Sequence, residues 1–102
     1  MSQHFFVKLI PRRATFPQDM TAEEREIMLR HRDYWTEWMH KKNVIVFGPV
    51  MDPAGVYGMG VVEAEDEAAV RTLLDGDPAI GLNRYEVFPM RAVHPGLQRD
   101  SA

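Results

Sequence analysis

A histidine inside a helix and an aspartate after a strand are the residues of this sequence best suited to chemistry. His31 lies among apolar residues with helical spacing, on the side of the helix that faces the protein interior. A buried imidazole needs a hydrogen-bonding partner. With a carboxylate beside it, it can act as a general acid or base near neutral pH. Asp52 is our candidate for that carboxylate: it would hold one ring nitrogen and leave the other free to act on a substrate.

Both residues also have a purely structural interpretation. His31 can be a core histidine bonded to a backbone carbonyl, and Asp52 can simply stabilise its own turn, where aspartate is common. If the site is functional, nearby aromatic and turn residues are expected to bind the substrate: Tyr34, Trp35, Trp38, Gly48 and Pro49.

The sequence predicts neither a metal site nor a bound cofactor. It contains no cysteine, no HxxxH pair and no carboxylates at ligand spacing. The other histidines, His4, His40 and His94, are expected at the surface. The glycines of a phosphate-binding loop precede a helix, whereas no helix follows the glycines after Asp52. We therefore expect any chemistry to proceed without metal or organic cofactor.

Four strands and two helices are predicted to position these residues. Runs of β-branched and aromatic residues predict strands at 4–10, 44–51, 57–64 and 85–93. The first helix begins at Thr21 with a capping box completed by Glu24, and Asn43 is expected to adopt the left-handed conformation at its end. The second helix is capped by Asp66 and ends at Gly76. The long segment 12–20 is a loop and a candidate lid.

This order of elements, βαββαβ, is typical of the ferredoxin-like α+β fold. Right-handed crossovers place the first and third strands in the middle of a four-stranded antiparallel sheet. The two prolines within strands, Pro49 and Pro89, then fall on edge strands, where a missing backbone donor is tolerated. Two helices cover one face of the sheet. Because the strand at 44–51 is apolar throughout, both of its faces should be buried, and we expect a homodimer that packs sheet against sheet.

Composition sets further limits. The chain of 102 residues, 45% of them hydrophobic, suits one domain spanning 1–102, with 94–102 as a flexible tail. A net charge of -3 without a long basic block argues against nucleic acid or an anionic membrane surface as a partner. No apolar run approaches membrane-spanning length and the first residues lack a signal-peptide pattern, so a cytoplasmic location is expected.

Taken together, the motifs resemble the YciI-like (YCII-related domain) family. The resemblance rests on His31-x-x-Tyr34, Gly48-Pro49-x-x-Asp52, the following Gly55, Asp77-Pro78 and the late Pro89. It implies a dimeric α/β barrel of ferredoxin-like subunits. It also implies an active site built on a histidine–aspartate pair, which matches His31 and Asp52. One family member is a dehydrochlorinase in chlorinated aromatic degradation, and muconolactone isomerases share the general fold.

Three functions are consistent with these observations. The first is a cofactor-independent enzyme acting on an anionic or aromatic small molecule, a lyase, dehydrochlorinase-like enzyme or isomerase that uses the His31–Asp52 dyad. The second is a non-catalytic dimeric domain that binds a metabolite or a protein partner. The third is a cofactor-free oxygenase. Turnover that depends on His31 would distinguish the first from the second, and oxygen consumption would indicate the third.

Overall fold

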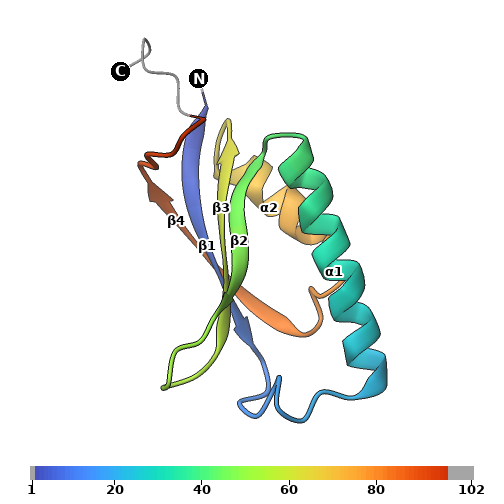
Figure 1. The fold of residues 1–102 in the computed structure, drawn as a ribbon. Helices are drawn as coiled ribbons and strands as arrows, with labels where there is room; N and C mark the ends of the chain where they lie inside the picture. Colours follow the sequence, from blue (N-terminus) through green and yellow to red (C-terminus); the bar gives the residue numbers. More distant parts are fainter. Residues whose placement is uncertain (1, 97–102) are drawn as a thin grey trace.

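The structure, a computed structural model, describes residues 2–96 and has the predicted order of elements (Figure 1). The strands are β1 (Gln3–Pro11), β2 (Val44–Val50), β3 (Tyr57–Ala64) and β4 (Asn83–Met90), and the helices are α1 (Ala22–His40) and α2 (Glu67–Asp75). Within the described part of the chain, neither helix is long and apolar enough to cross a membrane.

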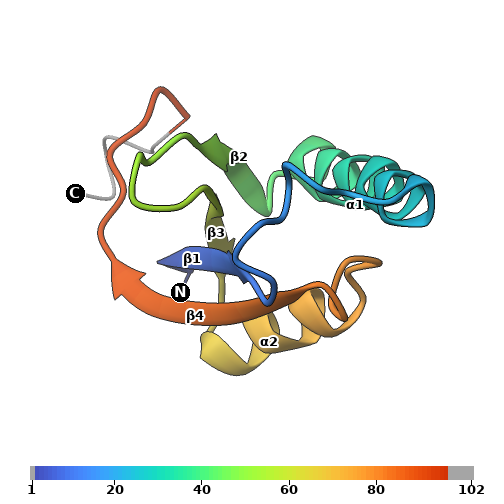
Figure 2. The same cartoon turned by 90° about the horizontal axis from the view of Figure 1, so that it is seen from below.

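The sheet has the predicted topology. Its order is β2-β3-β1-β4 and every neighbouring pair is antiparallel, so Pro49 and Pro89 do lie on edge strands. The last strand was misplaced: β4 begins at Asn83 and ends at Met90, because its pairing with β1 runs from Pro11 at one end to His4 at the other. Both helices cover the same face of the twisted sheet (Figures 1 and 2).

The core lies between this face and the helices. Trp35 is the largest fully buried side chain and packs against Phe47 of β2, with ring centroids 5.8 Å apart. Gly60 of β3 gives the indole its room, since a Cβ at this position would lie 2.5 Å from Cζ3 of Trp35. A glycine at this position of the strand is thus needed for close helix–sheet packing.

The start of α1 is stabilised as predicted, and it also anchors the preceding loop. The Thr21 hydroxyl accepts from the amide of Glu24, and the Glu24 carboxylate accepts from the amide of Thr21. Arg13 donates two bonds to the same carboxylate, at 2.8 and 2.9 Å, which is the main reason that the pKa of Glu24 falls to about 2. At the other end of α1, Lys42 rather than Asn43 adopts the left-handed conformation, with φ of 74°.

The second face of the sheet carries no helix, and we refer to it as the uncovered face. The expectation that both faces of β2 are buried is wrong for the single chain, because Val46 on this face is 48% exposed. Phe88 of β4 is 47% exposed, and Phe6 of β1 lies beside it with a ring separation of 6.4 Å. The segment that follows β4 turns back over this face (Figure 2). The homodimer is not part of the structure and stays a prediction.

Candidate functional site

The carboxylate beside His31 is that of Asp77, at the start of the turn that follows α2. Nδ1 of His31 lies 2.8 Å from one Asp77 oxygen and 3.0 Å from the other. Asp52 instead lies in the exposed turn after β2, where its side chain accepts from the amide of Ala54 at 2.9 Å. The predicted pairing is therefore corrected: Asp52 serves its own turn, as aspartates in turns commonly do. A catalytic part for Asp52 stays a prediction.

Asp77 is the centre of a buried hydrogen-bond network. Its side chain is fully buried, and besides His31 it accepts from the Trp35 indole at 2.9 Å, the Tyr85 hydroxyl at 2.8 Å and the Ala79 amide at 2.9 Å. These donors come from α1, from β4 and from the turn itself. One carboxylate thus joins segments that are far apart in the sequence, and burial without such partners would be costly.

These partners decide the protonation of Asp77. Burial alone would raise its pKa, but hydrogen bonding and charge attraction from His31, with the bonds from Trp35 and Ala79, lower it below the ordinary 3.8. Burial and the Asp77 charge raise the pKa of Tyr85, so its hydroxyl stays a donor. Asp77 is accordingly an ionised carboxylate near neutral pH, and a carboxylate can only accept hydrogen bonds.

The tautomer of His31 follows from this chemistry. Because Asp77 can only accept, Nδ1 of His31 must carry a proton and donate it to the bond. In the neutral ring Nε2 is then the unprotonated nitrogen, which is the state required of a general base. The pair therefore has the arrangement predicted for the site, with Asp77 in the orienting position.

Local sequence explains why Asp77 reaches this position. Asp66 caps the start of α2 by accepting from the amide of Ala69, and Gly76 ends the helix after two turns. Asp77 follows with its amide bonded to the Leu74 carbonyl, and its side chain bonds the amide two residues ahead, as in an Asx turn. This places the carboxylate beneath the buried side of α1.

His31 lines a large open cavity of about 880 Å³ between α1, the loop at 12–20 and the strands β2 and β3. Its walls are mostly apolar, with Phe16, Pro17 and Met20 from the loop and Met28, Trp35 and Met39 from α1. Arg32, Thr36 and Asn83 add polar side chains to the cavity wall. Since Nδ1 is bonded to Asp77, Nε2 is the ring nitrogen left for a molecule in this cavity. Apolar walls with a few polar groups are typical of small-molecule sites.

The predicted substrate-binding residues divide into two sets. Trp35, Gly48 and Pro49 line the cavity. Tyr34 instead joins the two helices, since its hydroxyl donates to the Leu73 carbonyl at 2.6 Å. Trp38 lies at a second, smaller cavity of about 190 Å³. The apolar residues of α1 therefore contact different parts of the structure. Helical spacing alone could not show which of them line the large cavity.

Sequence reasoning missed Asp77 and Tyr85 as members of the site. A signal for Asp77 was available, because Asp77-Pro78 is one of the motifs that carry the family resemblance. The dipeptide also suits an ordinary turn, and this local interpretation hid its second role. The loop at 12–20 was expected as a lid, and it does contribute to the cavity wall, with Phe16 only 6% exposed.

The fold and the site thus define a ferredoxin-like α+β protein with a buried histidine–aspartate pair beside an apolar cavity. Comparison with family models matches residues 5–93 to the YCII-related domain, so the chain belongs to that family. Comparison with curated protein sequences finds no match.

Among solved structures, this fold is similar to that of 5-chloro-2-hydroxyhydroquinone dehydrochlorinase (TftG) from Burkholderia phenoliruptrix AC1100, determined in complex with 2,5-dihydroxybenzoquinone. The two chains are 19% identical, with a TM-score of 0.65, and the match covers 89% of this chain and 94% of the other. At this identity the likeness shows a common fold.

Proposed function

We propose that this protein is a cofactor-independent enzyme that moves a proton to or from a small aromatic molecule, in an elimination or isomerisation. The observation that carries the proposal is the His31–Asp77 pair, whose oriented imidazole lines an apolar cavity of about 880 Å³. The dehydrochlorinase with a similar fold and its bound dihydroxybenzoquinone support a ring-shaped, hydroxylated substrate. Arg32, at the cavity wall, suits the negative charge of an ionised hydroxyl group.

The proposed chemical step requires no oxidant or reductant. Nε2 of His31 takes a proton from the substrate, and the electron pair left behind expels a leaving group such as chloride. The sum is loss of HCl from one molecule. The Nδ1–H bond to Asp77 stabilises the imidazolium that forms, as in the orienting role of a carboxylate in catalytic triads. In an isomerisation the same imidazolium would return the proton to another atom.

The experiment is a screen of chlorinated and unchlorinated hydroxyhydroquinones, followed by chloride release and by proton exchange in deuterated water. His31→Gln should lower turnover by about 10²-fold or more, the usual contribution of a general acid or base. His40→Gln, at the exposed end of α1, is the matched control. Asp52→Asn tests the other carboxylate, and full activity in that variant would remove Asp52 from the mechanism.

Two results would overturn the proposal. Full turnover by His31→Gln on a substrate of the native chain would show that the imidazole does not transfer the proton. Tight binding of ring compounds with neither turnover nor proton exchange would favour the non-catalytic binding domain, because the cavity would then be a binding site alone.

We also propose that two copies of the chain associate through the uncovered face. Phe88, Val46 and Met90 are exposed there by 47%, 48% and 36%, on the two edge strands β4 and β2. An apolar sheet face of this kind is typical of an interface, and a symmetric dimer is the commonest outcome. Sedimentation should give a dimer for the native chain and a monomer for Phe88→Asp. A native monomer at micromolar concentration would contradict the assignment.

A further inference from the structure

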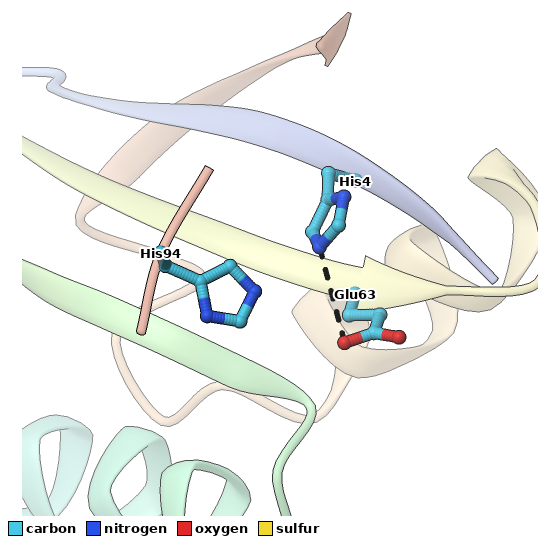
Figure 3. A group of neighbouring side chains, drawn as sticks. All are labelled: His4, Glu63 and His94. Atoms are coloured by element: carbon cyan, nitrogen blue, oxygen red, sulfur yellow. Dashed lines mark ion pairs between the residues drawn. The ribbon is translucent and has the colours of Figure 1, made fainter. Parts of the chain in front are cut away.

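A second group of chemically capable side chains lies on the uncovered face, at the end of the sheet away from His31. It consists of His4 of β1, Glu63 of β3 and His94 from the segment after β4 (Figure 3). His4 and Glu63 are paired across the two strands and so point to the same face. Leu9, at the cavity wall, lies five positions after His4 along β1, about 16 Å of strand.

We propose that these three residues form a binding site for a divalent transition-metal ion of the zinc class. One ligand atom from each residue can be chosen so that all three lie within 4.8 Å of one another. Nε2 of His4 and Nε2 of His94 are both buried without a hydrogen-bond partner. Buried polar atoms without partners are uncommon in folded proteins, and one ion bound between the two rings would satisfy both nitrogens.

The distance between His4 and Glu63 fits an ion after a small adjustment. Nε2 of His4 lies 3.9 Å from a Glu63 oxygen, too far for a direct hydrogen bond. Two ligands at about 2.0–2.1 Å from a tetrahedral ion lie about 3.3 Å apart, so the pair would need to approach by about 0.6 Å. Figure 3 shows the His94 ring facing the other two side chains across the sheet surface. The two imidazole rings are 5.5 Å apart and nearly perpendicular.

The donor set indicates the kind of metal. Two imidazoles and one carboxylate are ligands of zinc sites and of other first-row divalent ions, whereas magnesium and calcium prefer sites made of oxygen. Three protein ligands leave at least one position for water. The charge also suits a divalent cation, since Glu63 supplies the negative ligand and the imidazoles bind as neutral groups.

Metal binding has one local cost. The amide of Gly96 donates to Nδ1 of His94 at 3.1 Å, so in neutral His94 the proton lies on Nε2. When Nε2 binds the ion, the proton lies on Nδ1 instead, and the hydrogen bond from the Gly96 amide is lost. Gly96 is exposed, so water can take the place of the imidazole as acceptor. The proposal departs from the sequence-based expectation of surface histidines and no metal: the His4 side chain is only 13% exposed.

The test is a titration of the chelator-treated, untagged full chain with Zn²⁺ by calorimetry, with Co²⁺ absorption as a second readout. We expect one ion per chain and the visible bands of a Co²⁺ site with imidazole ligands. Glu63→Gln and His94→Gln should each weaken Zn²⁺ binding by about 10-fold or more. Both residues lie outside the helix-side core, so the variants should fold, as circular dichroism can verify.

His40→Gln is the control, because His40 is exposed at the end of α1 and outside the cluster. It should bind Zn²⁺ as the native chain does. Absence of stoichiometric binding by the native chain overturns the proposal, as does binding that is unchanged in both His94→Gln and Glu63→Gln. The result is independent of the His31 experiments, since none of the three residues lines the large cavity.

Discussion

Asp77→Asn is the substitution that most directly tests the network at the site. In the native chain Oδ1 accepts from His31 and from the Ala79 amide, while Oδ2 accepts from Trp35 and Tyr85. An asparagine has one acceptor oxygen, so its NH₂ group must face either the Ala79 amide or the Trp35 indole, and neither donor can reverse its role. One buried donor left unpaired costs about 1–3 kcal/mol, and the lost charge on the remaining bonds adds about 1 kcal/mol. We expect a loss of about 2–4 kcal/mol in the free energy of unfolding.

Urea unfolding followed by circular dichroism measures this loss, with the slope checked for two-state behaviour. Asp52→Asn is the matched control, because it makes the same chemical change at an exposed turn, where only the bond from Ala54 is affected. It should cost less than about 1 kcal/mol. If Asp77→Asn lost no more stability than Asp52→Asn, the network could not be holding α1, β4 and the turn together.

The pH dependence of unfolding gives a second readout of the same variant. The pKa of Asp77 in the folded chain lies below its ordinary value of 3.8, so at acidic pH the unfolded chain binds more protons there. The contribution of Asp77 to stability is therefore complete above that ordinary value and is lost as pH falls through the folded-state pKa. Asp77→Asn should therefore reduce this acid dependence, and an acid dependence equal to that of the native chain would contradict the assignment.

Two further substitutions test the packing around the site. Gly60→Ala places a Cβ 2.5 Å from the Trp35 ring and should cost about 1–3 kcal/mol in urea unfolding, whereas Gly48→Ala, with nothing within 4 Å, should change stability by less than about 0.5 kcal/mol. Equal effects of the two would refute the close contact. Glu24→Gln weakens the bidentate partner of Arg13, so amide exchange in the loop at 12–20 should accelerate while that of α2 stays the same. Unchanged loop exchange would show that Arg13 does not anchor this cavity wall.

The fold could be predicted from the sequence because its determinants are local. The capping box at Thr21, the aspartate cap of α2 and the proline positions each fix one element or edge without knowledge of the others. The order of elements then leaves few topologies. The end of β4 could not be placed in this way, since it depends on which residues of β1 remain to pair with it.

The site could be predicted only in part, because its partners are joined across long separations. The helical position of His31 indicated that it faces inward, and it does. Its carboxylate lies 46 residues further along, in a turn that is common for local reasons alone. Asp52 had the same local features, so turn chemistry could not rank the two. Only the three-dimensional fold distinguishes them, because it places Asp77, and not Asp52, next to His31 of α1.

The corrected pairing also decides which substitution reports on catalysis. Asp77 orients His31 but also binds Trp35, Tyr85 and the Ala79 amide, so its replacement disturbs the core and the imidazole together. His31→Gln removes the imidazole while the other three donors still satisfy the buried carboxylate. A loss of turnover in that variant, with unfolding free energy near the native value, would therefore belong to the imidazole itself. The same loss in Asp77→Asn could arise from either effect, and only the pair of variants separates them.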